Sequence, residues 1–238
     1  MKYLNVQLRI ISTCRDDLTK HAVNTAVHKT RVAIRRARVA IAMLGPLPHL
    51  KGLSRDLKTL GKRLERVGDL DVVVAHAAEV STDTKRLFRK RKQAAKKLWH
   101  SVNVKKRSNY TKRFKRLGYL EREPNPHAVA AFLNKNLISI QTRAGSLSPD
   151  EKELHSLRTA MKRTRYLLEA SDRPVQEMKR LQTLLGESHD LQVLNDFAGT
   201  NAMTTADQRR VTAKARPLIQ KTVERAITKL RQLSGDIN

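Results

Sequence analysis

One short pattern occurs twice in this chain, as HKTRVAIRRAR at residues 28–38 and as HSLRTAMKRTR at residues 155–165. Each copy begins with a histidine, places an arginine three residues later, and continues with cations separated by small or apolar residues. A repeat in register indicates an internal duplication. The matched pairs are His28 with His155, Arg31 with Arg158, Arg35 with Lys162, Arg36 with Arg163 and Arg38 with Arg165.

Both copies lie in segments with the period of a packed helix. Apolar and small residues recur at spacings of four and three from Val23 to Leu44, and Gly45-Pro46 follows them. The second copy repeats this period from Leu154 to Leu168. Such spacing predicts helices that bury one side in a bundle, the first of them ending at the Gly-Pro pair.

The remaining chain also predicts helices, with no segment of sustained alternation that would favour a strand. Leucines and a valine from Leu53 to Val67 continue the helical period, and Gly68-Asp69 predicts a break with Asp69 capping the next helix. Residues 148–151, Ser-Pro-Asp-Glu, are typical of a helix start. We therefore predict an all-α fold.

A second matched element follows each copy of the first. LERVGDLDVV at 64–73 aligns with LGESHDLQVL at 185–194, which pairs Asp69 with Asp190 and, in the same register, Lys58 with Lys179. Two prolines interrupt the segment 121–128. The halves therefore resemble duplicated helical bundles, which we place at residues 1–123 and 124–238 of a single domain.

The composition indicates a polyanionic partner. The chain has 238 residues, with 49 Lys and Arg against 22 Asp and Glu, giving a formal net charge of +27. Nucleic acid, anionic lipid and phosphate polymers all fit such a charge. The single cysteine, Cys14, excludes an intrachain disulfide and favours a reducing compartment. No apolar run approaches the ~18 residues of a membrane span, so we expect a cytoplasmic protein without membrane contact.

Helix geometry arranges the repeated cations in a row. At about 100° per residue, His28, Arg31, Arg35 and Arg38 fall within roughly 80° of one another and extend over about 15 Å. Like charges at these spacings destabilise a helix by roughly 0.2–0.5 kcal/mol per pair, so folding alone does not favour the row. Arginine presents a planar fork of donors that matches phosphate oxygens. The alternatives are a solvated basic face and, for each histidine, a boundary position in the core.

The two copies, each followed by a leucine-rich helix and a segment containing Asp-Leu, resemble the CHAD family, the conserved histidine α-helical domain. This resemblance implies two four-helix bundles related by a pseudo-twofold, with a basic surface between them that binds inorganic polyphosphate. It also implies a location at polyphosphate granules. The implied binding residues are His28, Arg31, Arg35, Arg36, Arg38, Lys58, His155, Arg158, Lys162, Arg163, Arg165 and Lys179. The chain departs from the family at Glu65, where glycine is common, and at Gly68, where arginine is common.

Residues 84–120 support an alternative function. This segment contains 15 Lys or Arg and no Asp or Glu, interleaved with Phe88, Trp99, Tyr110, Phe114 and Tyr119. Basic residues with interleaved aromatics can bind nucleic acid without sequence specificity. We expect instead that the aromatics fill the core of the first bundle, because a periodic helix would bury them.

Motifs for catalysis are absent from the sequence. It contains no P-loop, no dinucleotide-binding glycine motif and no HExxH. Asp69 and Asp71 could hold Mg²⁺, but a helix start explains them equally well and the second copy has Gln192 in place of the second aspartate. We predict a binding protein without enzymatic activity, cofactor or metal.

Overall fold

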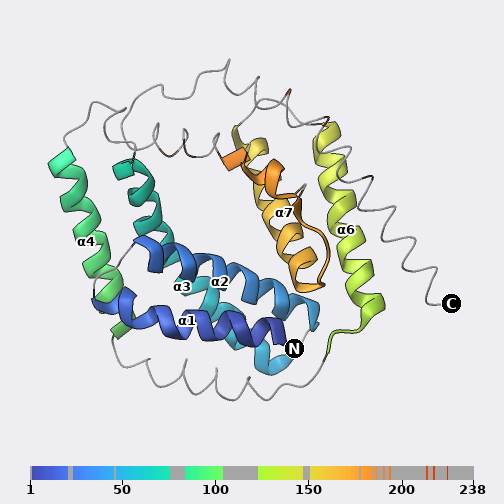
Figure 1. Cartoon of the computed structure of the whole chain (residues 1–238), viewed down its shortest axis with the longest axis horizontal. Coiled ribbons are helices and arrows are strands. Elements are labelled where there is room, and N and C mark those ends of the chain that lie inside the picture. The colour runs from blue at the N-terminus through green and yellow to red at the C-terminus, as the bar shows by residue number, and fades with distance from the viewer. Residues whose placement is uncertain are drawn as a thin grey trace. The chain divides into compact units, whose positions relative to one another are not determined.

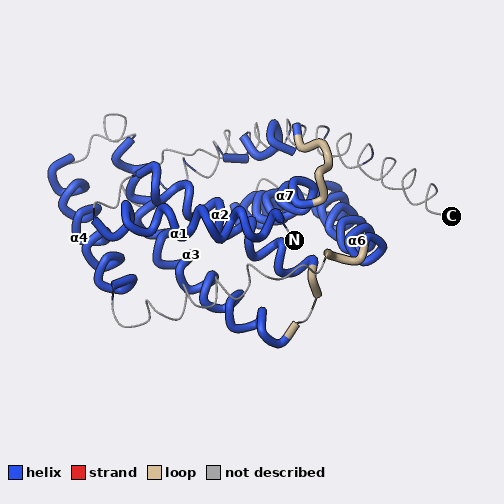
Figure 2. The backbone as a smooth tube through the Cα atoms, turned by 60° about the horizontal axis from the view of Figure 1, so that its bottom comes forward, coloured by secondary structure: helices blue, strands red, loops and turns tan. Residues whose placement is uncertain are grey.

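The computed structural model describes residues 2–20, 24–45, 47–75, 84–103, 123–146, 151–176, 178–183 and 185–186, with residues 190, 193, 213, 217 and 224. Helices make up most of this part of the chain, which contains no strand (Figure 2). The all-α prediction is confirmed. None of the described helices is long and apolar enough to span a membrane. The chain divides into two compact units, Met1–Pro124 and Asn125–Asn238.

The first unit is built from α1 (Lys2–Lys20), α2 (Asn24–Met43), α3 (Pro48–Ala75) and α4 (Thr84–Asn103). Along this part of the chain α2 packs against α1 and α3, while α4 packs against α3 and α1 (Figure 1). Each of these four helices therefore packs against two others, which is the arrangement of a bundle with a shared core. Leu4 of α1, Ile34 of α2, Leu57 of α3 and Leu87 of α4 are buried in it.

The apolar period of α2 is the side that the bundle buries. Val27 and Ile34 are 1% and 2% exposed, and the small residues Thr30 and Ala37 on the same side of the helix are fully buried. The predicted helix over 23–44 and its end at Gly45-Pro46 agree with α2, although residue 23 lies outside the described part. Gly45 has a φ of +80°, the left-handed conformation in which helices commonly end.

The predicted break at Gly68-Asp69 is wrong. Helix α3 continues without interruption from Pro48 to Ala75, so Asp69 is an interior residue and not an N-cap. Packing explains the difference, because Val67 and Leu70 on either side are buried and hold the helix against the core. Burial of these flanking residues outweighs the roughly 1 kcal/mol by which an interior glycine disfavours a helix.

The second unit contains α6 (Pro126–Gly145) and α7 (Glu151–Ala170), which pack against each other. Asn125 caps α6, because its Oδ1 accepts hydrogen bonds from the backbone N–H groups of His127 at 2.9 Å and Ala128 at 3.3 Å. The predicted start of α7 at residues 148–150 lies outside the described residues. After α7, residues 178–183 are helical and bury Met178 and Leu181.

Helices α2 and α7 bury corresponding positions. In the register of the sequence repeat, Val27, Thr30, Ile34, Ala37 and Ile41 of α2 match Leu154, Leu157, Met161, Thr164 and Leu168 of α7, and all of these are buried. Thr30 is matched by Leu157 and Ala37 by Thr164, so the position of burial is repeated while the side chain changes. The pseudo-twofold relation between the bundles stays a prediction.

Candidate polyanion-binding site

Helix α2 carries its repeated cations along one side, which we call the α2 row: His28, Arg31, Arg35 and Arg38. His28 and Arg38 are exposed, whereas Arg31 and Arg35 are partly buried. The row borders the buried stripe of the helix, so the stems of the inner arginines pack on the bundle while the ends of the row face water. Arg36 is also partly buried, but helix geometry places it about 120° away from the middle of the row.

Arg31 crosses from α2 to α3 and lies over Gly68. A Cβ on Gly68 would fall 2.8 Å from Cζ of Arg31, a distance that such atoms do not adopt. The guanidinium then reaches Asp69, with Nη2 3.4 Å from Oδ1. The packing of α2 against α3 thus explains Gly68, because Arg31 fills the space that a side chain at this position would occupy.

Asp69 is the carboxylate that meets Arg31, and its surroundings shift its pKa. Burial raises the pKa of Asp69 above its ordinary value, and the nearby carboxylate of Glu65 adds to that effect. Arg31 and, more weakly, Arg35 lower it, but burial is the larger influence. Arg35 therefore lies within electrostatic reach of Asp69, and Asp69 offsets part of the positive charge of the α2 row.

Lys58 extends the cationic surface from α3. It is exposed and precedes Asp69 by eleven residues, which is about 16 Å along a helix. Because α2 and α3 are joined by a short turn and pack as an antiparallel pair, the crossing of Arg31 with Asp69 places Lys58 toward the Arg38 end of the row. At the Arg38 end of the α2 row, both α2 and α3 therefore carry a cationic side chain.

Helix α7 carries the matching α7 row: His155, Arg158, Lys162 and Arg165. His155 is exposed, whereas Arg158, Lys162 and Arg165 are partly buried. Lys179, which follows α7 in the chain, is exposed. The predicted binding residues of the second copy are therefore all at least partly accessible to solvent.

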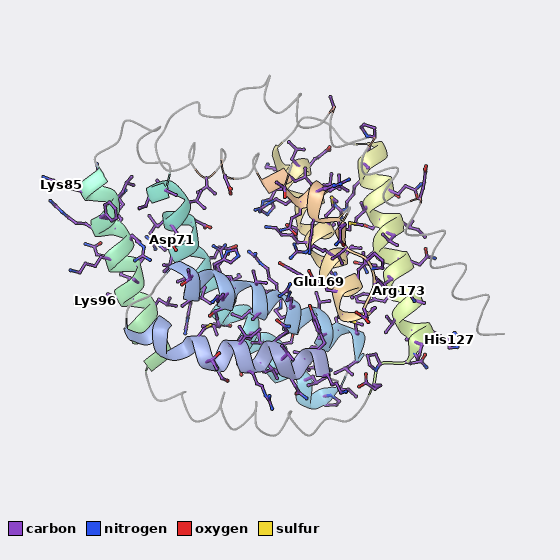
Figure 3. All side chains as sticks on the ribbon, viewed as in Figure 1. Asp71, Lys85, Lys96, His127, Glu169 and Arg173 are labelled. Atoms are coloured by element: carbon purple, nitrogen blue, oxygen red, sulfur yellow. The ribbon has the colours of Figure 1, made fainter. Side chains whose placement is uncertain are left out.

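Arg165 is held by residues of its own helix. Its Nε lies 3.4 Å from Oε1 of Glu169, one turn further on, and its guanidinium lies 4.7 Å from the ring centre of Tyr166. Glu169 is labelled on α7 in Figure 3. An ion pair and a cation–π contact fix this side chain, so Arg165 is less available to a ligand than an exposed arginine.

Arg163 faces a different direction from the α7 row. Its guanidinium lies 5.0 Å from the ring centre of Phe132 on α6. Arg143 of α6 in turn donates a hydrogen bond to Ser156 of α7. These contacts join α6 to α7, so Arg163 has a packing role that its position in the repeat did not indicate.

The aspartate considered for Mg²⁺ has a different partner. Oδ1 of Asp71 accepts a hydrogen bond from Nε of Arg91 at 2.7 Å, which ties α3 to α4. Across the described residues no group of three or more His, Cys, Asp or Glu side chains could hold a metal ion. Asp71 acts here as an interhelical ion-pair partner.

The expectation that the aromatics of 84–120 are buried is wrong for Phe88, which is 56% exposed. The buried side of α4 is formed by Leu87, Ala94 and Leu98, and Phe88 lies one residue, or about 100°, away from it. The side chain of Trp99, together with Tyr110, Phe114 and Tyr119, lies outside the described residues.

Sequence reasoning found the cations of both rows and interpreted Asp69 and Asp190 as helix caps and arginine partners. It did not identify Arg31 as the partner of Asp69, and it missed the partners of Arg91 and Arg165. The spacing of Arg165 and Glu169 by four residues is a signal that could have indicated their ion pair. The pairs Arg31 with Asp69 and Arg91 with Asp71 join different helices, and no local spacing indicates them.

Comparisons with known proteins agree with the all-helical fold. A model of the CHAD domain matches residues 2–199, so the chain belongs to the CHAD-domain family, whose known property is the binding of polyphosphate. Among solved structures, the CHAD domain from the plant Ricinus communis is 20% identical with a TM-score of 0.67, and the match covers 98% of this chain and 88% of that one.

A second solved structure, PptA from Streptomyces chartreusis, is 16% identical with a TM-score of 0.63, and the match covers 97% of this chain and 96% of that one. At these identities the two structures show the fold. The comparison with curated proteins found no match.

Proposed function

We propose that this protein binds inorganic polyphosphate without altering it, and that the α2 row and the α7 row, with Lys58 and Lys179, supply the contacts. The observation that carries the proposal is the repeated row itself. Each copy presents an exposed histidine followed by three cations at helical spacings of three, four and three residues, all partly buried except the exposed Arg38. Membership of the CHAD-domain family supports the same ligand.

The chemistry of the rows suits a phosphate polymer. Successive cations on one side of a helix rise about 4.5–6 Å apart, so a linear anion can meet several of them in turn. Arginine forks bind phosphate oxygens in pairs, and neutralisation of the polyanion releases its counterions. Binding of this kind needs no cofactor, and the affinity should fall as the salt concentration rises.

The proposed role also covers location. We expect the protein to meet polyphosphate in the cytoplasm, including at polyphosphate granules, because a net charge of +27 favours accumulation on a concentrated polyanion. A fluorescent fusion that stays dispersed in cells rich in granules would contradict this part of the proposal.

Calorimetric titration of the full chain with polyphosphate tests the proposal, with thermal unfolding as a second readout. A ligand that binds the folded state raises its stability by RT ln(1 + [L]/Kd), so the unfolding temperature should rise with polyphosphate concentration. Phosphorus NMR of the same sample should show unchanged chain length. Release of orthophosphate would contradict the non-catalytic role.

A charge-matched pair of variants separates the rows from the overall charge. We compare Arg38→Glu with Lys179→Glu against a control of Lys29→Glu with Lys135→Glu, all at exposed positions. Lys29 lies about 140° from the middle of the α2 row, so both double variants lose the same charge but differ in its place. We expect at least tenfold weaker binding in the first and about a twofold change in the control. Equal losses would refute the proposal.

A further inference from the structure

Helix α4 has two sides of opposite character. Leu87, Ala94 and Leu98 are buried at spacings of seven and four residues and face the bundle. Arg91 lies on that inner side and is held by Asp71 of α3. The other side exposes Lys85, Arg89, Lys92 and Lys96, again at spacings of four, three and four residues. Figure 3 shows Lys85 and Lys96 on the side of α4 away from Asp71.

The outer side of α4 is a second cationic surface, separate from the α2 row. From Lys85 to Lys96 its cations extend over about 16 Å, and α4 contains no acidic residue to offset them. Lys90 and Lys97 add exposed positive charge on its flanks. A polyanion is therefore the partner whose charge fits this surface.

Phe88 distinguishes this surface from the α2 row. It is 56% exposed and lies within about 60° of Lys85 and about 40° of Lys92 around the helix. Because more than half of this large aromatic side chain is exposed, packing in the core does not account for its position among the cations. It does provide a flat apolar face next to groups that bind phosphate.

The aromatic ring decides between the possible polyanions. Inorganic polyphosphate has no apolar part and cannot use the ring. A membrane surface needs an apolar side turned outward, but the apolar side of α4 is packed into the bundle. Bases of single-stranded nucleic acid stack on exposed aromatics while neighbouring cations hold the backbone, without regard to sequence.

We propose that the outer side of α4 binds single-stranded nucleic acid. Lys85, Arg89, Lys92 and Lys96 contact successive phosphates, and a base stacks on Phe88. This surface acts independently of the polyphosphate-binding rows, so each can fail without the other.

Fluorescence anisotropy with two labelled probes of equal charge tests the proposal on the full chain. One is an oligouridylate of about twelve nucleotides, a typical site size, and the other is its abasic counterpart, which keeps the sugar-phosphate backbone. We expect about tenfold tighter binding of the oligouridylate, because stacking contributes only there. Equal affinity for both probes would overturn the proposal.

Variants of Phe88 give the decisive control. Phe88→Ala should remove the preference for the oligouridylate and leave the affinity for the abasic probe unchanged, whereas Phe88→Tyr should retain the preference. The ring is exposed, so neither change should alter folding, which thermal unfolding checks. An equal loss of affinity for both probes in Phe88→Ala would contradict a stacking role.

The phosphate contacts have their own readout. Changing Lys85, Arg89, Lys92 and Lys96 together to Gln should lower the slope of log affinity against log salt for the oligouridylate by about 3, at roughly 0.7 per phosphate contact. If this variant instead loses polyphosphate binding as strongly as oligouridylate binding, α4 is part of the polyphosphate surface and the proposal is wrong. Loss of polyphosphate binding in Arg38→Glu with Lys179→Glu tests the rows separately.

Discussion

Helices α2 and α7 carry the same row of cations but restrain different members of it. In α2, Asp69 of α3 holds Arg31 at 3.4 Å. In α7, Glu169 and Tyr166 of the same helix hold Arg165. The residues of α2 that correspond to Glu169 and Tyr166 are Ala42 and Val39, so Arg38 has no carboxylate one turn further along its own helix, and its side chain is exposed.

A repeated position therefore does not ensure equal access to a ligand. An arginine that already pairs with a carboxylate must exchange that partner for a phosphate, so its net contribution to binding is smaller. The neighbours, which the repeat does not preserve, therefore decide which cation of each row binds most strongly. Predictions that exchange these neighbours test this conclusion.

The largest difference between the copies should appear at Arg38 and Arg165. We expect Arg38→Gln to weaken polyphosphate binding about tenfold, since it removes a charged hydrogen bond worth about 1.5 kcal/mol. Arg165→Gln should weaken binding about threefold, because Glu169 already offsets its charge. Calorimetric titration of the two single variants measures the contrast, and equal losses would show that both arginines meet the ligand alike.

The histidine of each row, His28 in α2 and His155 in α7, is exposed. Binding should tighten about fivefold from about pH 8 to about pH 6, because bound phosphate favours the positively charged imidazole. His28→Gln and His155→Gln should each remove a similar share of this change. The measurement is affinity against pH at constant ionic strength, and a flat profile for the unaltered chain would refute a role for either histidine.

Exchanging the neighbours of Arg38 and Arg165 should reverse their roles. Ala42→Glu places a carboxylate one turn after Arg38, as in α7, and should weaken polyphosphate binding about threefold. Glu169→Ala should strengthen it by a similar factor. Ala42 is exposed, and Ala42→Gln controls for side-chain length without the charge. Unchanged affinity in both exchanges would show that these carboxylates do not compete with the ligand.

The ends of the two helices offer a comparison in stability. Gly45 after α2 has a φ of +80°, and the matching residue after α7, Asp172, has a φ of +53°. Their N–H groups donate to Ala42 and Glu169 at 3.3 Å in each case. We expect Asp172→Gly to raise the free energy of unfolding by about 0.5 kcal/mol, because glycine adopts this conformation without a steric cost.

Urea unfolding measures that change. Asp172→Asn is the matched control, because it removes the charge and keeps the side chain. If Asn stabilises as much as Gly, the charge near the helix C-terminus is the cause and not the backbone conformation.

The smallest effect should come from the partner of Arg31. Burial raises the pKa of Asp69, so the folded state favours its protonated form and stability is lost as pH rises through that raised pKa. The stability of Asp69→Asn relative to the unaltered chain should therefore increase from acid to neutral pH. Its affinity for polyphosphate should rise by less than about twofold, because Arg31 loses a competing partner. A stability difference that does not vary with pH would contradict the shifted pKa.

Local sequence was enough to predict the helices and the cation rows. Residues close together in the sequence set the apolar period of α2, its end at the Gly-Pro pair, and the angle around the helix between His28 and Arg38. The prediction of a helix break at Gly68 was wrong because contacts with distant parts of the chain determine the structure at this position. There the residue that fills the space beside the glycine is Arg31, which is 37 residues earlier in the chain.

By itself, the sequence determined that this chain forms helices, that its pattern repeats, and that a polyanion is the partner its charge favours. These properties follow from residue type and spacing along a single helix. The tertiary structure alone decided that Asp69 holds Arg31, that Asp71 turns Arg91 inward, and that Phe88 stays in water. Contacts of this kind depend on which side of one helix meets which side of another, and spacing within either helix does not contain that information.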